Sequence, residues 1–99
     1  SLQTLSTESS GKTYIQADSP RATSWDVMRP ANNFSYIIIQ NFSDNDLILV
    51  RANEELPLFE FFTSQGQKNQ VIIDPWSTAY LQSFTDGSGF NWKYIGSEE

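Results

Sequence analysis

Carboxylates in a turn are the first side chains of this sequence that could carry chemistry. Asp44 and Asp46 stand in the cluster 41–46, with Asn41 and Asn45 beside them, and such side chains supply the oxygen ligands that Ca²⁺ binds. A calcium site needs roughly six to eight oxygens, which is a fuller set than this cluster offers. The same residues are typical of a turn in which Asx side chains hydrogen-bond to their own backbone. The cluster therefore predicts a turn without a metal ion.

The composition removes most routes to catalysis. The 99 residues include no His and no Cys, which excludes a histidine general base, the Ser–His and Cys–His nucleophile pairs, and disulfides. A glycosidase would need two carboxylates at a defined separation, and the spacing brings no two of the candidates together. Those candidates are Asp18, Asp26, Glu54, Glu55 and Glu60. We predict a protein that is not an enzyme and has no cofactor.

The charge balance also excludes classes of partner. Twelve acidic and six basic side chains give a net charge of −6, which argues against binding to nucleic acid or to an anionic membrane surface. The longest apolar run, 36–39, is far shorter than the roughly 20 residues of a membrane helix. Residues 1–4 have neither the basic nor the apolar character of a targeting segment, and without Met at position 1 we expect a processed product or an excised domain.

Short β-type runs separated by turn residues dominate the chain, and helical periodicity is nearly absent. Runs at spacings of about 8 to 12 residues are typical of a β-sandwich, a jelly roll or a small barrel. We predict an all-β fold, a small antiparallel β-sandwich or jelly-roll-like barrel of about seven to eight short strands, with residues 1–10 as a leading arm and 11–99 as the single domain. The expected strands are 13–17, 25–28, 34–40, 47–50, 70–74, 78–82 and 90–95, with 56–62 as an edge strand or a tightly packed loop.

Two of these strands invite a more specific prediction. The run 34–40 is so rich in β-branched and aromatic residues that we expect it to be covered on both faces. The run 47–50 follows after a turn cluster, and we expect it to return antiparallel to 34–40 as a hairpin with a long loop.

Apolar residues outside these regular strands are candidates for a partner interface. Apolar groups lie on both faces of an edge-like segment that contains Leu58, Phe59, Phe61 and Phe62. This predicts contact with another subunit or domain, and the alternative is a strand folded under a loop. Trp76 directly follows a proline that interrupts the strand pattern. It could be a sugar platform, an interface anchor, or a core or lid residue. The interface candidates are thus Leu58, Phe59, Phe61 and Trp76.

A series of motifs, taken in order, resembles a recurrent β-module of tailed-bacteriophage virion proteins that occurs in tail fibres, tail spikes and capsid-surface proteins. The motifs are S-G-K-T-Y at 10–14, N-F-S-Y-I-I-I-Q-N at 33–41, V-I-I-D-P at 71–75, A-Y-L at 79–81, T-D-G at 85–87 and N-W-K-Y-I at 91–95. The chain departs from the pattern where Pro75-Trp76-Ser77 replaces Pro-Gly-Glu, in a final turn that is longer by Ser88-Gly89-Phe90, and between residues 51 and 69, where no motif matches.

The resemblance implies a structural role on the virion surface. It implies a module that decorates a phage capsid or tail, contacts a capsid or tail protein, and self-associates, with a homotrimer as the expected state. The alternative is a carbohydrate-binding or receptor-binding domain of a tail fibre or adhesin, with a host surface glycan as ligand. The feature that would distinguish that function is a planar set of exposed aromatic rings, with Trp76 as a member and Trp25 or Phe90 as further candidates.

Overall fold

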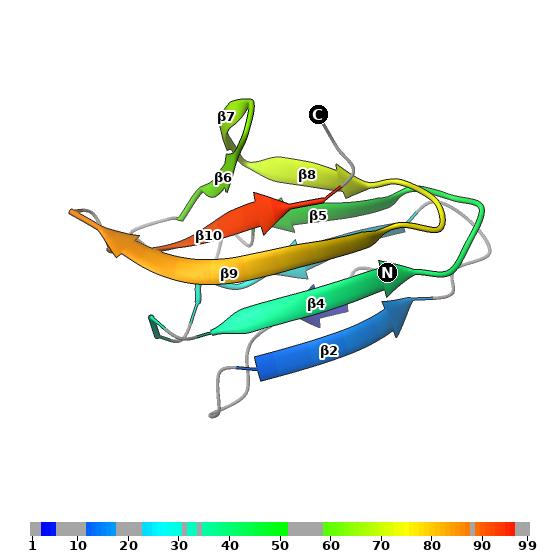
Figure 1. The fold of residues 1–99 in the computed structure, drawn as a ribbon, viewed down its shortest axis with the longest axis horizontal. Coiled ribbons are helices and arrows are strands. Elements are labelled where there is room, and N and C mark those ends of the chain that lie inside the picture. Colours follow the sequence, from blue (N-terminus) through cyan, green and yellow to red (C-terminus); the bar gives the residue numbers. More distant parts are fainter. Residues whose placement is uncertain are drawn as a thin grey trace.

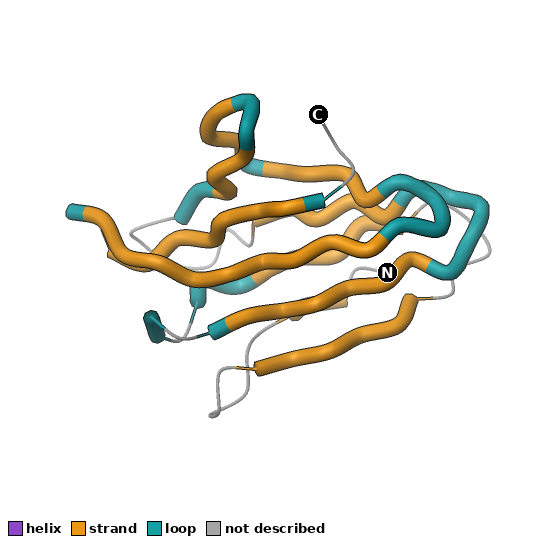
Figure 2. The backbone as a smooth tube through the Cα atoms, viewed as in Figure 1, coloured by secondary structure: helices purple, strands orange, loops and turns teal. Residues whose placement is uncertain are grey.

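Ten β-strands and no helix make up the part of the chain that the structure describes. The structure is a computed structural model, and it describes residues 3–5, 12–17, 23–30, 32–33, 35–51, 59–87 and 89–96. Figure 1 and Figure 2 show the strands arranged as two layers. The strands are β1 (Gln3–Leu5), β2 (Lys12–Ala17), β3 (Thr23–Val27), β4 (Tyr36–Asn41), β5 (Leu47–Arg51), β6 (Phe61–Thr63), β7 (Gly66–Lys68), β8 (Gln70–Ile73), β9 (Thr78–Asp86) and β10 (Gly89–Ile95). No helix among these residues is long and apolar enough to cross a membrane. The prediction of a small all-β fold is confirmed.

The chain alternates between the two sheets. One sheet has four strands in the order β1-β3-β5-β8, and the other has six in the order β2-β4-β9-β10-β6-β7. Because the chain changes sheet after every strand from β1 to β5, next-but-one strands become neighbours and run parallel, as β1, β3 and β5 do, and as β2 and β4 do. Antiparallel pairs join β5 to β8, β4 to β9 and β9 to β10. Both sheets are therefore mixed, whereas the sequence predicted antiparallel pairing.

The runs 34–40 and 47–50 do not form the predicted hairpin. β4 belongs to the six-stranded sheet and β5 to the four-stranded sheet, so the loop between them crosses the edge of the sandwich. The crossing lets the apolar face of each strand point into the same core. β4 is also covered on one face only, because Ile37 and Ile39 are fully buried whereas Tyr36 is exposed. The prediction that this strand is covered on both faces is wrong.

The core lies between the sheets and follows the period of two along each strand. In β9, Ala79 and Leu81 are fully buried, whereas Tyr80 between them is exposed. Trp92 is also fully buried, and its indole Nε1 donates a hydrogen bond to the backbone oxygen of Met28 at 2.9 Å. Other core side chains come from both sheets and include Trp25, Val27, Ile37, Ile39, Leu47, Leu49, Val71, Ile73 and Tyr94.

Two of the predicted interface residues belong to this core. Phe59 and Phe61 are 2% and 0% exposed, and their rings meet edge to face with centroids 5.3 Å apart. This corrects the prediction that they form an interface, because both rings are already enclosed within a single chain. Phe62 points to the other side of β6 and meets the ring of Phe84 edge to face, with centroids 4.9 Å apart. Leu58 lies outside the described residues.

Part of the predicted leading arm belongs to a sheet. Residues 3–5 form β1, which pairs in parallel with β3, so that Gln3 lies opposite Trp25 and Leu5 opposite Val27. The four-stranded sheet thus begins before residue 11, where the sequence placed the start of the domain.

Truncation of Phe61, whose ring is enclosed in the core, should destabilise the fold far more than truncation of the neighbouring Phe62. We expect Phe61→Ala to lower the free energy of unfolding by about 3–5 kcal/mol, because it leaves a cavity in the core. The control Phe62→Ala removes a ring of the same size from a half-buried position and should cost clearly less. Urea denaturation of both variants measures the difference, and equal losses would contradict the placement of Phe61 in the core.

Candidate functional site

A row of tyrosine and isoleucine side chains crosses the outer surface of the six-stranded sheet. Tyr14 on β2 lies opposite Ile38 on β4, and Ile38 lies opposite Tyr80 on β9. Tyr80 in turn lies opposite Ile95 on β10, so four consecutive strands contribute to one row. Tyr14, Tyr80 and Ile95 are 57%, 45% and 62% exposed. Tyr36 lies two positions before Ile38 on the same side of β4, and we call these five residues the tyrosine face.

The tyrosine face is a shallow, contiguous surface rather than a set of isolated side chains. An open hollow of about 490 Å³ lies on it, and Tyr36, Ile38, Tyr80 and Ile95 contribute to its lining. At its edge the hydroxyl of Tyr14 donates a hydrogen bond to Oε1 of Gln40 at 2.6 Å. A contiguous exposed apolar surface on a small domain is typical of a site of protein contact.

Carboxylates are absent from this surface in the part that the structure describes. The net charge of the chain is −6, yet the register places no Asp or Glu in the tyrosine row or in the two rows beside it, and the charged residues at these positions are Lys12 and Lys93. Among the described residues, the acidic groups therefore lie outside these three rows. The two neighbouring rows are Gln16-Gln40-Thr78 and Lys12-Tyr36-Gln82-Lys93.

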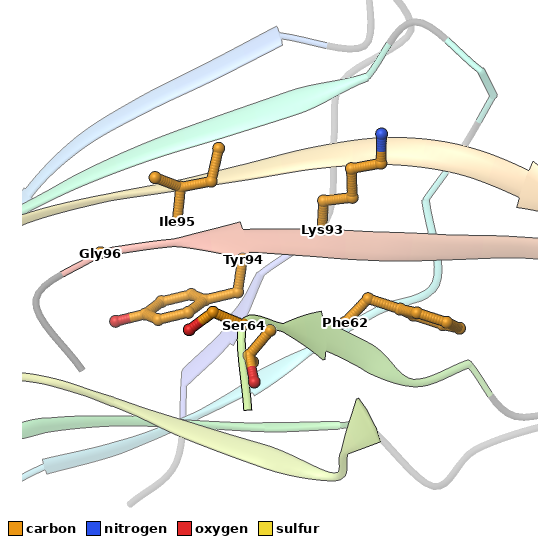
Figure 3. Close-up of a pocket in the computed structure, with 7 residues that line it drawn as sticks. Phe62, Ser64, Lys93, Tyr94, Ile95 and Gly96 are labelled. Atoms are coloured by element: carbon orange, nitrogen blue, oxygen red, sulfur yellow. The ribbon is translucent and has the colours of Figure 1, made fainter. Parts of the chain in front are cut away.

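A second hollow, of about 390 Å³, lies beside β10. Figure 3 shows Lys93 and Ile95 on one side of this strand and Tyr94 on the other. The Lys93 ammonium lies 5.3 Å from the centroid of the Phe84 ring, and the Tyr94 hydroxyl donates to the backbone oxygen of Ile72 at 3.1 Å. The described residues that line the hollow include Lys93 and Tyr94 and no carboxylate.

A third feature lies where two loops meet. Trp76, in the turn between β8 and β9, is 64% exposed. Its indole Nε1 donates a hydrogen bond to Oδ1 of Asp44 at 2.7 Å. The ring of Phe42 lies against it with centroids 6.2 Å apart and planes tilted by 44°. Phe42 and Asp44 belong to the loop between β4 and β5, and we call Phe42, Asp44 and Trp76 the tryptophan corner.

The backbone at Trp76 adopts a conformation that favours glycine. Its φ is +60°, and the other residues with positive φ among those described are Gly66 and Gly89. Pro75 followed by a residue with positive φ is the pattern of a type II turn, in which the second position is usually Gly. A side chain in this region costs about 1–2 kcal/mol. Trp76 is therefore held in a strained position while its ring remains exposed.

A buried amide joins the two loops of the tryptophan corner. Asn41 is 1% exposed, and its Nδ2 lies 2.7 Å from the backbone oxygen of Asn45, 3.2 Å from that of Ile73 and 3.3 Å from that of Asp74. Its backbone N–H donates to the backbone oxygen of Ser77 at 2.9 Å. One side chain thus connects the loop that leaves the six-stranded sheet with the turn that returns to it.

The described carboxylates do not form a metal-binding group. The described residues contain no group of three acidic side chains close enough to share a metal ion. Asp44 accepts the hydrogen bond from Trp76, and Glu60 forms an ion pair with Arg51. Asp18, Glu54 and Glu55 lie outside the described residues.

The planar set of aromatic rings that the sequence suggested is not formed. Trp76 is exposed, but Trp25 is only 7% exposed and packs in the core, and Phe90 is half-buried. Phe42 takes the place beside Trp76 instead. Sequence reasoning missed both Phe42 and the tyrosine face, although tyrosine at the polar positions of an alternating strand, as at 36 and 80, is a usable signal.

Comparisons with known proteins found no matching family model, no matching curated protein and no matching solved structure. The functional interpretation of the two surfaces depends on their own chemistry.

Removal of the Asn41 amide should loosen both loops together. We expect Asn41→Ala to lower the free energy of unfolding by about 1–3 kcal/mol, because it removes the buried hydrogen bond to the Ile73 oxygen and the amide contacts to Asn45 and Asp74. The control Gln40→Ala removes the neighbouring amide, whose bonds are exposed, and should cost less. Thermal and urea denaturation measure both, and equal stability of the two variants would contradict the role given to Asn41.

The strain at position 76 can be measured with two substitutions that remove the same ring. Trp76→Gly should be more stable than Trp76→Ala by about 1 kcal/mol, because alanine keeps a Cβ that resists positive φ and glycine does not. Chemical denaturation gives the difference directly. If alanine is as stable as glycine, the backbone at this position is not left-handed in solution.

Proposed function

We propose that this chain is a non-enzymatic structural module of a virion surface that associates with copies of itself through the tyrosine face. The observation that carries the proposal is the registered row Tyr14, Ile38, Tyr80 and Ile95 across four consecutive strands. Tyrosine is enriched at protein interfaces because its ring buries a large apolar area while its hydroxyl keeps a polar partner. A second copy offers a surface of the same kind.

The distribution of charge supports self-association in particular. Two molecules that each carry a net charge of −6 repel one another over most of their surface. The described rows of the tyrosine face carry no carboxylate, so two copies that meet there bring no acidic groups into direct opposition. Interfaces are depleted of acidic residues in the same way.

The place of the module on a phage particle is supported by the order of sequence motifs. The resemblance to a β-module of tailed-phage virion proteins runs from residue 10 to residue 95 and implies contact with a capsid or tail protein. It also implies a homotrimer, in which the tyrosine faces of three copies lie around a common axis. The absence of His and Cys from the sequence supports a role without catalysis.

Light scattering coupled to size exclusion tests self-association. We expect a mass of about three times 11.3 kDa for the unaltered chain at two concentrations. Tyr80→Glu should reduce the mass to that of one chain, because it buries a carboxylate opposite its counterparts in the other copies. Its circular dichroism should remain that of the folded protein, since Tyr80 is exposed.

The matched control is Gln70→Glu. It adds the same carboxylate at an exposed strand position of the four-stranded sheet and should leave the mass unchanged. A single-chain mass for the unaltered protein at both concentrations would overturn the proposal. A dimer would retain the self-association and replace the threefold arrangement by a twofold one.

A further inference from the structure

The tryptophan corner has the properties of a built site rather than of a structural turn. Trp76 occupies a backbone position with φ of +60°, which costs about 1–2 kcal/mol for a residue with a side chain. Core packing does not account for this cost, because the ring is 64% exposed. Strained residues that remain exposed are concentrated at functional sites. The chain therefore keeps a tryptophan where glycine would fold more easily.

The indole is held in one orientation. The hydrogen bond from Nε1 to Asp44 fixes its rotation, and the ring of Phe42 supports it from the side. The two loops that carry these groups are held together from below by the buried amide of Asn41. A ring that is already oriented loses little conformational entropy when a ligand binds.

The groups at the corner select the chemistry of the ligand. An exposed indole face accepts a flat apolar surface, and the carboxylate of Asp44 accepts hydrogen bonds from hydroxyl groups. Asp44 and Asp74 are exposed, and the segments 41–46 and 73–78 contain no Lys or Arg, so phosphates and other anions are disfavoured. The ring of Phe42 lies beside the indole, with centroids 6.2 Å apart, and the indole stays 64% exposed.

We propose that the tryptophan corner binds an uncharged sugar, with one pyranose ring stacked on the indole of Trp76 and a ring hydroxyl donating to the carboxylate of Asp44. A pyranose combines an apolar C–H face with hydroxyl donors around its rim, and this combination matches the corner. The site shares no residue with the tyrosine face, so it adds a glycan-binding activity to the proposed structural role.

Tryptophan fluorescence of the full chain tests this proposal. The chain has three tryptophans, and Trp25 and Trp92 are 7% and 0% exposed, so a ligand that changes the emission acts on Trp76. The probes are methyl glucoside, methyl galactoside and methyl mannoside with neutral oligosaccharides of the same sugars, and choline and glucuronate as charged counterparts. We expect a saturable change with at least one neutral sugar and none with the charged probes.

Variants locate the site. Trp76→Gly should remain folded and should lose sugar binding, which isothermal calorimetry detects without the fluorophore. Asp44→Asn keeps an oxygen for the indole N–H but replaces the other acceptor by a donor, so it should weaken binding roughly tenfold. The matched control Asp46→Asn makes the same charge change in the same loop and should bind as the unaltered chain does.

The outcomes separate this proposal from self-association. Sugar binding by the Tyr80→Glu variant at unchanged affinity would show that the corner works independently of the oligomer. The absence of a response to every neutral sugar would overturn the proposal, as would a response confined to choline or glucuronate. Binding retained in Trp76→Gly would overturn the placement of the site.

Discussion

The side chain of Asn41 is the interaction on which the arrangement of the sandwich most depends. It lies where the chain leaves β4 for the opposite sheet, and it also reaches the carbonyl groups at the end of β8, where the chain returns. A buried carbonyl group without a donor costs free energy, and the Asn41 amide lies within hydrogen-bond distance of three carbonyl oxygens, of which that of Ile73 is buried. The two crossings are therefore coupled, and the position of Trp76 follows from that coupling.

The repeated crossing between sheets has a consequence for the surface. Because strands adjacent in sequence lie in opposite sheets from β1 to β5, the neighbours within each sheet come from distant parts of the chain. The tyrosine face is assembled in this way from β2, β4, β9 and β10. Its members are spread from Tyr14 to Ile95, yet the register places them in one row. Such a surface persists only while the pairing of four strands is correct.

The two surfaces differ in the chemistry that they offer. The tyrosine face is broad, nearly flat and free of carboxylates in its described rows, which suits contact with another protein surface. The tryptophan corner is small and strained and places a carboxylate beside an exposed indole, which suits a compact ligand that combines an apolar face with hydroxyl donors. A module with both surfaces would bind other copies through the tyrosine face and a glycan through the tryptophan corner.

Composition and alternation were sufficient to determine the class of the fold. The short runs between turn residues, the period of two and the near absence of helical periodicity predicted an all-β domain, and most of the expected strands occur near their predicted positions. The core residues of β9 could also be anticipated, because Ala79 and Leu81 alternate with polar or aromatic residues there. In β4 the unbroken run of isoleucines predicted cover on both faces instead. Because the sequence contains no His and no Cys, it also excluded the Ser–His and Cys–His nucleophile pairs.

The tertiary structure alone decided which strands are neighbours, and with them the surfaces. Alternation shows which side of a strand is apolar but not which sheet the strand joins. The same pattern is therefore compatible with a hairpin of 34–40 and 47–50 in one sheet and with two strands in opposite sheets. For the same reason Phe59 and Phe61 could be assigned to an interface when they fill the core. Exposure of Trp76, its contact with Phe42 and the row from Tyr14 to Ile95 all depend on contacts between residues far apart in sequence, which local patterns do not encode.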